Sequence, residues 1–390
     1  MKSTQATAST SPKIQRVGVV GGGQLAAMMG DAAKALGIEL LVQTPDAADP
    51  AVSVADGAVL AAVDDVLATA ELADRCDVIT FENEFVDLDG LRSLAEQGVL
   101  FQPSLSSLSP LLDKYVQRCY LQDLGLPTPR FWAWDCSQDL HLDFPFAVKV
   151  RRHGYDGQGT FIVKDRESLE SICDRVKGQS LLVEEFVPFD RELAAIAARS
   201  ATGEIAIYPI VETQQKNQVC RLAIAPADIS LEVKSEAEAI VRTLLNSLQA
   251  VGIFGIELFL TADNQLLVNE IAPRTHNSGH FTIDACETSQ FEQHLRAVCQ
   301  LPLGNCDLHS AGAVMVNLLG YESAESDYLE KRQQLAQIDG AFVHWYGKKV
   351  SRPGRKLGHV TVLLSEEAVD RGGVQARAIA QTVESIWNPN

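Results

Sequence analysis

Residues 255–273 read GIELFLTADNQLLVNEIAP, two apolar segments separated by a polar turn at Asp263 and Asn264. This pattern predicts a β-hairpin, because apolar and aromatic residues favour strands and an Asp-Asn pair favours a turn. If the strands pair about that turn, Glu257 lies opposite Glu270 among apolar neighbours. Two carboxylates about 4 Å apart repel each other by about 4 kcal/mol at an effective dielectric constant near ~20.

The opposed carboxylates have three interpretations. One of them could be protonated, or both could face solvent on an edge hairpin, which their apolar neighbours disfavour. A divalent cation relieves the repulsion more effectively, and hard oxygen ligands select Mg²⁺ held jointly with nucleotide phosphates. The hairpin therefore predicts a magnesium and nucleotide site with Glu257 and Glu270 as metal ligands.

The following stretch, NEIAPRTHNSGH (269–280), offers a rival metal site. His276 and His280 stand four residues apart, which is the spacing of zinc ligands on one face of a helix. A proline and a Ser-Gly pair within the stretch interrupt such a helix, so the zinc interpretation loses its geometry. We expect Arg274 and His276 on a loop that leaves the magnesium site toward an anionic substrate. His280 is either structural or part of that loop's site.

A glycine-rich loop, RRHGYDGQG (151–159), lies between the apolar segments 146–150 and 160–164. No helix follows it, so it is neither a Walker A loop nor a Rossmann turn. Its backbone N–H groups could cover phosphates like a flap. Lys149 stands in the apolar strand before it, where a buried ammonium needs an anion. The alternative is an ordinary tight turn with a snorkelling lysine.

A second glycine motif, GGGQLA (21–26), follows a predicted strand and begins a predicted helix, as in dinucleotide-binding folds. The acidic residue expected at the end of the next strand is replaced by Gln43. Three interpretations stay open: an NAD-type cofactor, a phosphate or other small ligand at the helix start, and purely structural glycines.

The order of predicted elements indicates an α/β and α+β protein. Before residue 110, helical patterns alternate with three strands, which predicts a Rossmann-like parallel sheet; these strands are VGVV (17–20), IELLVQ (38–43) and DVITF (77–81). A helix at 111–125 then precedes predicted antiparallel strands at 146–150, 160–164, 180–187, 193–198 and 204–211. The last strands, AVMVNLL (313–319), FVHWY (342–346) and HVTVLL (359–364), predict a small β-rich C-terminal domain. Boundaries are expected at 102–110 and 300–312.

Composition limits the function. The 390 residues carry a formal net charge of −18, which argues against nucleic acid as a partner. No apolar run is long enough to span a membrane, and residues 1–13 lack the apolar core of a secretory signal. Eight cysteines without a C-x-x-C pair indicate reduced thiols and a cytoplasmic protein. The basic cluster at 348–356 suits a small anionic substrate.

Five motifs in order resemble one family. GGGQLAAMM (21–29), FENE (81–84), HGYDGQGT (153–160), NEIAPRTHNSGHFT (269–282) and HWYGKKVSRPGRKLGHV (344–360) resemble the 5-(carboxyamino)imidazole ribonucleotide synthases (PurK class) of the ATP-grasp superfamily. The resemblance runs from about residue 14 to 365. It implies a disordered tail (1–13), a Rossmann-like pre-ATP-grasp domain (14–110), an ATP-grasp domain (111–304, with a flap subdomain at about 135–190) and a C-terminal β-rich domain (305–390).

The resemblance also implies site residues. For ATP they are Lys114, Lys149, the flap residues Gly154, Tyr155, Asp156, Gly157, Gln158, Gly159 and Thr160, the hinge residues Glu184, Glu185, Phe186 and Val187, the ribose ligand Glu192, and Asn269 and Glu270. Glu257 and Glu270 would hold two Mg²⁺ ions. The second substrate would meet Gln24, Glu84, Tyr155, Arg274, His276, Asn277, Lys348, Arg355 and Lys356. Asp156, Arg274 and Lys356 would be catalytic, and Gln215 stands where many members carry histidine.

The implied reaction starts when bicarbonate attacks the γ-phosphate of ATP and forms carboxyphosphate. Carbon dioxide released from it carboxylates 5-aminoimidazole ribonucleotide, in de novo purine (IMP) biosynthesis. The family also implies a homodimer and transfer of the product to a mutase. Two rivals remain: formate-dependent glycinamide ribonucleotide transformylase of the same superfamily, and an NAD-dependent oxidoreductase based on GGGQLA. A non-catalytic nucleotide-binding module would require the Glu257 and Glu270 pair to be broken, and it is intact.

Overall fold

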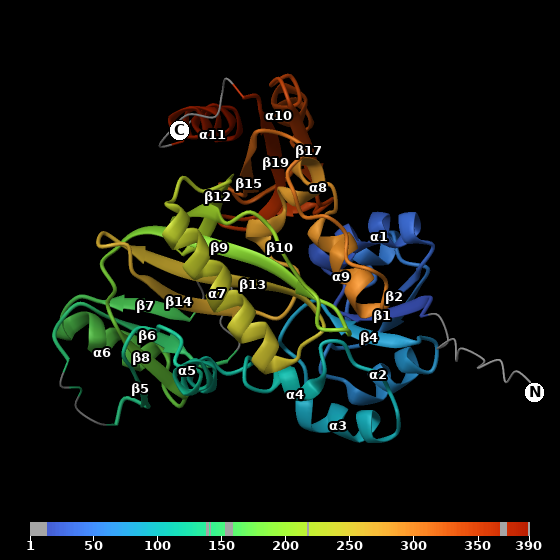
Figure 1. Ribbon diagram of the computed structural model, residues 1–390, viewed down its shortest axis with the longest axis horizontal. Coiled ribbons are helices and arrows are strands. Elements are labelled where there is room, and N and C mark those ends of the chain that lie inside the picture. Colours follow the sequence, from blue (N-terminus) through green and yellow to red (C-terminus); the bar gives the residue numbers. More distant parts are fainter. Residues whose placement is uncertain are drawn as a thin grey trace, which may run out of the picture.

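The computed structural model describes residues 14–137, 140, 142–152, 159–216, 218–366 and 373–388. Three sheets organise the chain (Figure 1): a parallel N-terminal sheet, a small antiparallel sheet, and a large antiparallel sheet between and above them. Within the described part of the chain, no helix is both long and apolar enough to cross a membrane.

The N-terminal sheet is parallel, as predicted, with strand order β3-β2-β1-β4. Its elements are β1 (Arg16–Val20), α1 (Gln24–Leu36), β2 (Glu39–Thr44), a 3-10 turn (Pro50–Ser53), β3 (Gly57–Leu60), α2 (Val66–Ala73), β4 (Val78–Phe81), α3 (Leu88–Glu96) and α4 (Leu105–Leu108). The short strand β3 was not predicted, because GAVL carries neither a long apolar run nor a clear alternation. Strands β2 and β3 lie on one side of β1, and β4 lies on its other side, so the order of the strands switches between β1 and β4. Open α/β folds form their binding crevice at such a switch point.

The small sheet has the order β5-β8-β6-β7, with every pair antiparallel. Its region contains α5 (Lys114–Asp123), β5 (Phe131–Trp134), β6 (Phe146–Val150), β7 (Thr160–Val163), α6 (Arg166–Arg175) and β8 (Leu181–Glu185). The residues between β6 and β7, which include most of the predicted flap, lie outside the described residues from 153 to 158.

The large sheet has nine strands in the described chain, in the order β14-β13-β9-β11-β12-β15-β19-β17, with β10 paired to β9. Its strands are β9 (Phe189–Arg199), β10 (Ile205–Ile207), β11 (Val211–Lys216), β12 (Val219–Ala225), β13 (Gly252–Thr261), β14 (Leu266–Ala272), β15 (Gly312–Leu319), β17 (Ala341–Trp345) and β19 (Lys356–Leu364). The predicted C-terminal strands β15, β17 and β19 are present. They extend the central sheet through β12 instead of forming a sheet of their own.

Helices cover this sheet. They are α7 (Leu231–Leu248), α8 (Thr282–Ala285), α9 (Gln290–Val298), α10 (Leu329–Leu335) and α11 (Val374–Trp387), with a 3-10 turn at Asn277–Gly279 and a short pair formed by β16 (Ala324–Glu325) and β18 (Val350–Ser351). Helix α7 lies across one face of the sheet (Figure 1) because Val233, Ala237, Val241 and Leu244 repeat every three or four residues and are buried. Helix α9 packs its apolar face against α1 and β1 of the N-terminal region.

The β13–β14 hairpin forms as predicted, and Glu257 lies opposite Glu270. The register contains a β-bulge that the sequence did not reveal. Leu258 pairs with Val268, so an unbroken register would place Glu257 opposite Asn269. The bulge inserts Asn269 as an extra residue and brings Glu270 into position, as bulges do beside active sites.

Candidate active site

A cavity of ≈ 670 Å³ lies where loops of the three regions meet, a volume typical of small-molecule sites. Most of the predicted site residues line it. They are Gln24, Glu84, Lys114, Lys149, Thr160, Glu184, Glu185, Phe186, Val187, Glu192, Glu257, Asn269, Glu270, Arg274, His276, Asn277 and Lys356. The tertiary fold therefore gathers residues from both ends of the chain into one pocket.

The acidic pair lies in this pocket and is partly compensated. The ammonium of Lys114 contacts Glu270, and the Asn269 side-chain amide donates to Glu257 at 3.0 Å. Burial and the neighbouring Glu270 raise the pKa of Glu257 to about 7. Burial opposes ionisation of Glu270 as well, but the positive charge of Lys114 holds the pKa of Glu270 below its ordinary value. The single positive charge of Lys114 does not balance two ionised carboxylates, so a further cation could bind beside them.

Lys149, predicted to meet ATP phosphates, is held by acceptors on two strands. Its ammonium lies 2.7 Å from Glu184 and donates to Asn269 at 3.0 Å. Glu184 also contacts Arg118, and despite burial the two cations lower the pKa of Glu184 to about 2. The Glu184 side chain therefore pairs with Lys149 and Arg118 at the border of the pocket.

Sequence reasoning missed Arg118. Its guanidinium donates to the carbonyls of Val268 and Asn269, at 3.0 and 2.6 Å, and thereby secures the strand at the bulge. A signal was present: Lys114 and Arg118 stand four residues apart, so they share one face of α5.

Two phenylalanines give the part of the pocket predicted to hold the nucleotide an apolar surface. Phe189 and Phe259 line the pocket with rings stacked 4.6 Å apart, and neither was predicted. Glu192 pairs with Phe259 in the register of β9 and β13 and also lines the pocket. Burial and the charge of Glu257 raise the pKa of Glu192 to about 7. Gln215 also lines the pocket.

The opposite end of the pocket carries the predicted second-substrate residues. Arg274 forms an ion pair with Glu84 at 2.9 Å, and His276 Nε2 lies 3.5 Å from Glu257. The side-chain amide of Asn277 exchanges hydrogen bonds with that of Asn317. Lys356 completes the wall.

Two predicted phosphate ligands, Lys348 and Arg355, are not among the described residues that line this cavity. Lys348 contacts the Gln24 side chain and donates to the Lys356 carbonyl at 2.9 Å. Arg355 donates to the Val350 carbonyl at 2.6 Å. Neither side chain lines the cavity as the structure describes it. Gly159 lies on a neighbouring cavity, and Gly154, Tyr155, Asp156, Gly157 and Gln158 lie outside the described residues.

The structure excludes the helical zinc site at His276 and His280, for the reason predicted from the sequence. Residues Asn277–Gly279 form a 3-10 turn, so His276 and His280 do not share a helical face. His280 is fully buried, its Nδ1 accepts from the Gln290 amide at 3.2 Å, and the residue also borders the ≈ 670 Å³ cavity.

A separate group, Asp284, His344 and His359, brings ligand atoms within 4.8 Å of one another. The two imidazole rings are stacked 4.5 Å apart at only 14°, so one ion cannot lie in both ring planes. His344 instead bonds Asp284 at 2.8 Å. We interpret this group as packing between the C-terminal strands and α8.

The GGGQLA motif holds an internal anion. The Glu82 carboxylate, which follows β4, accepts hydrogen bonds from the backbone N–H groups of Gly23, Leu25 and Ala26 at 2.6, 3.0 and 3.3 Å. The helix start that would bind a dinucleotide pyrophosphate is therefore occupied by the protein itself. Gln43 is buried, donating to Ala62 and Asp65 carbonyls, and takes no part in a ribose site.

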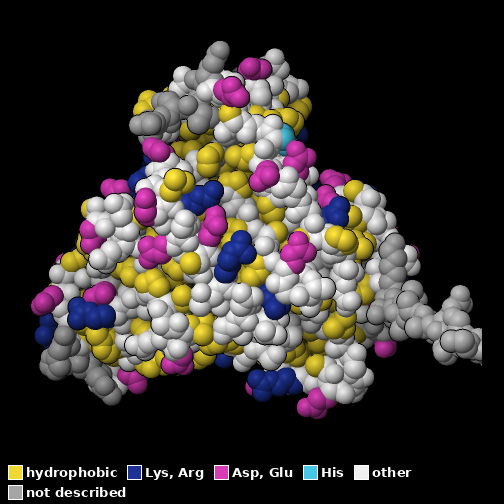
Figure 2. All heavy atoms as spheres, in the orientation of Figure 1, with side chains coloured by type: hydrophobic (Ala, Val, Ile, Leu, Met, Phe, Trp, Pro, Cys, Tyr) yellow, Lys and Arg dark blue, Asp and Glu magenta, His cyan; other side chains and the backbone are white. Residues whose placement is uncertain are grey.

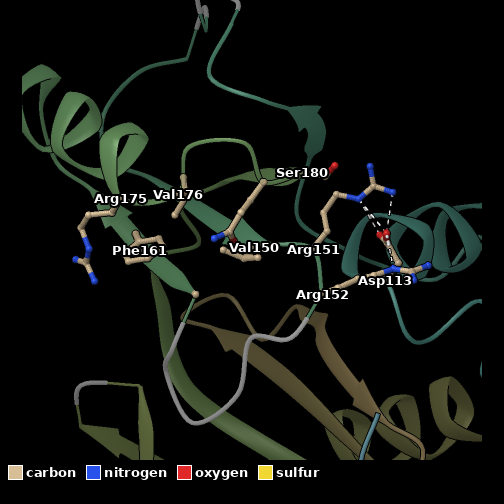
Figure 3. Close-up of a pocket in the computed structure, with 10 residues that line it drawn as sticks. Asp113, Val150, Arg151, Arg152, Phe161, Arg175, Val176 and Ser180 are labelled. Atoms are coloured by element: carbon tan, nitrogen blue, oxygen red, sulfur yellow. Dashed lines mark hydrogen bonds and ion pairs between the residues drawn. The ribbon is translucent and has the colours of Figure 1, made fainter. Parts of the chain in front are cut away.

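A second cavity, of ≈ 710 Å³, is lined by residues next to the glycine loop, among them Val150, Arg151 and Phe161 (Figure 3). Its basic side chains already have partners: Arg151 pairs with Asp113 at 2.8 Å, and Arg175 lies over the Phe161 ring at 4.9 Å. The described residues that line it include no counterpart of the acidic pair, so the ≈ 670 Å³ cavity is the candidate active site.

Comparison with known proteins identifies the family. Family models match residues 14–109 (ribonucleotide synthetase preATP-grasp domain), 119–291 (ATP-grasp domain) and 313–370 (phosphoribosylaminoimidazole carboxylase C-terminal domain). N5-carboxyaminoimidazole ribonucleotide synthase of Synechococcus elongatus is 53% identical over 97% of each chain.

Two solved structures of the Aspergillus clavatus enzyme are also similar. The ATP complex has a TM-score of 0.88 and 31% identity, over 96% of this chain and 99% of that one. The complex with ADP and 5-aminoimidazole ribonucleotide has a TM-score of 0.86 and 30% identity, over 97% and 100%. The chain therefore belongs to the N5-carboxyaminoimidazole ribonucleotide synthase family and is an ATP-dependent carbon–nitrogen ligase of the ATP-grasp class.

Proposed function

We propose that the chain uses ATP and bicarbonate to convert 5-aminoimidazole ribonucleotide to its N5-carboxy derivative in de novo purine biosynthesis. One observation carries this proposal: the Glu257 and Glu270 pair lies in a single pocket between two lysines on one side and Arg274 and Lys356 on the other. The Aspergillus clavatus relative binds ADP and 5-aminoimidazole ribonucleotide, the two ligand types that such a pocket would hold.

On the nucleotide side, Lys114 and Lys149 would neutralise the ATP phosphates. Residues 184–187 would contact adenine from the end of β8, and Glu192 would bind the ribose hydroxyls. The stacked Phe189 and Phe259 rings supply an apolar surface for the base. Glycine-loop residues 154–160 would close over the phosphates.

The residues present fit magnesium. Glu257 and Glu270 offer hard carboxylate oxygens, and the repulsion from Glu270 that, after burial, raises the pKa of Glu257 is one that a bound cation would relieve. Glu257 and Glu270, with Asn269 beside them, would hold two Mg²⁺ ions. Such ions supply charge neutralisation for the transferring phosphoryl group. Lys114, which contacts Glu270, would lie beside the phosphates that these ions hold.

The reaction would proceed by two group transfers. A bicarbonate oxygen attacks the γ-phosphorus, the bond to the ADP oxygen breaks, and carboxyphosphate forms. Carboxyphosphate then yields carbon dioxide and phosphate, and the exocyclic amine of the ribonucleotide attacks the carbon and loses a proton. Arg274, oriented by Glu84, would hold bicarbonate and carboxyphosphate, while Lys356 and Asp156 would handle the proton.

On the second-substrate side, Gln24, Glu84, Tyr155, His276 and Asn277 would contact the ribonucleotide. Lys348, Arg355 and Lys356 remain our proposed ligands of its 5′-phosphate, since arginine forks and lysine ammonium groups suit phosphate. We further propose the domain division at residues 110 and 304, a cytoplasmic homodimer, and transfer of the carbamate product to a mutase.

The test is ADP release with Mg²⁺ and ATP, with bicarbonate and the ribonucleotide each present or withheld. We expect release only when both are present, together with carboxylated product. Formate, supplied with glycinamide ribonucleotide, tests the sister transformylase. Release that ignores both bicarbonate and 5-aminoimidazole ribonucleotide would refute the assignment.

A further inference from the structure

The GGGQLA loop is shaped around Glu82. A Cβ added at Gly23 would lie 2.5 Å from Glu82 Oε1, and one added at Gly21 would lie 2.6 Å from Glu82 Cβ. Gly21 also has φ +126, a conformation that side chains rarely adopt. These glycines therefore allow a carboxylate to approach the backbone as closely as a bound phosphate would in a dinucleotide fold.

Holding Glu82 there is costly. The residue is 8% exposed, and burial raises the pKa of its carboxyl group. Three backbone N–H groups and the more distant charge of Arg274 offset that cost. A local serine or aspartate at the helix start would satisfy the same donors, as Asp65 does for α2. Glu82 instead reaches α1 from 59 residues away in sequence, so it joins two loops as well as capping a helix.

The two joined loops carry second-substrate residues. Gln24, the first residue of α1, contacts Lys348. Glu84, two residues after Glu82, holds Arg274 at 2.9 Å. These loops follow the adjacent parallel strands β1 and β4, at the crevice where the order of the strands switches. Glu82 makes a direct hydrogen-bonded contact between them at the pocket wall.

We propose that Glu82 is a positioning residue for the second substrate. Its carboxylate replaces a bound phosphate at α1 and so fixes Gln24 and Glu84, through which Lys348 and Arg274 are oriented. A corollary is that the ribonucleotide phosphate binds at the basic segment 348–356 and not at the helix start. This inference rests on the proposed function, because it assigns the substrate whose binding depends on Glu82.

The experiment compares Glu82→Ala with Asp65→Ala in the full-length chain. Both remove a carboxylate from a helix N-terminus of the same sheet, but Asp65 accepts from Leu67 and Ala68 at 3.0 and 3.1 Å, away from the pocket. For Glu82→Ala we expect KM for the ribonucleotide to rise about tenfold or more, with KM for ATP changed less than about twofold. Asp65→Ala should change neither constant.

Acetate provides a second readout, since it matches the CH2–COO⁻ group that Glu82→Ala removes. Acetate, against chloride of equal ionic strength, should raise the Tm of Glu82→Ala and lower its KM saturably, with no such effect on Asp65→Ala. An unchanged KM for the ribonucleotide, an equal rise in both KM values, or no response to acetate overturns the inference.

If Glu82→Ala does not fold, Glu82→Gln decides the question, because Gly23 donates to Oε2 and Leu25 to Oε1, and an amide keeps only one of these two acceptor oxygens. A parental KM in that variant overturns the inference, and a raised KM for the ribonucleotide alone supports it. Failure of the parent chain to release ADP in response to the ribonucleotide refutes the proposed function instead. The acetate-dependent Tm then still tests the internal anion site.

Discussion

Glu184→Gln tests the buried charge network behind the nucleotide pocket. Glu184 is 2% exposed and lies between Arg118 and Lys149, themselves 2% and 7% exposed. Its pKa falls from 4.5 to about 2, which at roughly 1.4 kcal/mol per pKa unit corresponds to about 3 kcal/mol of stabilisation. Removing one partner of a buried pair costs ~3–5 kcal/mol, because the other charge stays buried. We therefore expect a loss of about 3 kcal/mol, or a Tm lower by about 4 °C for a chain of 390 residues.

The pH dependence has a defined sign. A carboxyl group whose folded pKa is depressed stabilises the protein fully above its unfolded pKa, near 4.5. That contribution disappears as pH falls toward about 2. The difference in free energy of unfolding between parent and variant should therefore be constant above pH 5 and shrink below it. Urea unfolding followed by circular dichroism at pH 7, 5, 4 and 3 measures it.

The neighbouring residue supplies the control. Glu185 stands next on β8 and pairs with Arg130 at 2.7 Å, but the Arg130 side chain is 75% exposed. Glu185→Gln should cost less than about 1 kcal/mol, as surface ion pairs do. Equal losses in the two variants, or a loss below about 1 kcal/mol for Glu184→Gln, would refute the reasoning.

Three further predictions concern the metal site, the proton step and an interdomain histidine. Glu270→Gln should abolish ribonucleotide-dependent ADP release while leaving the urea midpoint nearly unchanged; near-parental turnover would contradict the metal assignment. Lys356→Met should still release ADP but form less carboxylated product per ADP, measured by phosphate release against product formation, and a parental ratio would remove Lys356 from the second step. His294 accepts from the Ile253 N–H and bonds Thr80, and burial lowers its pKa to about 4. The stability that neutral His294 confers is present above pH 6.5 and lost as pH falls, by about 2 kcal/mol at pH 5. In His294→Gln, urea unfolding at pH 7 and 5 should show that loss reduced, and an undiminished loss would exclude His294 as its source.

Charged side chains of both signs are distributed over the surface that Figure 2 shows. Figure 2 shows acidic and basic side chains interspersed over one face of the molecule, with hydrophobic side chains between them. On this face the acidic side chains are scattered and do not gather into one patch.

Local features of the sequence predicted much of the site. Glu257 and Glu270 stand out because ionisable residues are costly in apolar strands, and the Asp263 turn limits how those strands can pair. The parallel N-terminal sheet followed from alternating strand and helix patterns. Each of these signals lies within about twenty residues of sequence, where periodicity and turn chemistry act.

Only the tertiary structure decided how distant groups satisfy one another. The hairpin pattern could not show that a bulge at Asn269, secured by Arg118, is needed to oppose the two glutamates. Nor could GGGQLA show whether its helix start binds a cofactor, because backbone N–H groups accept any anion of suitable shape. Glu82 occupies them from the end of another strand. The sequence by itself indicated which ionisable residues, such as Glu257 and Glu270, stand in apolar segments. The fold determined which groups these residues pair with, because pairing energies depend on distances that local patterns do not specify.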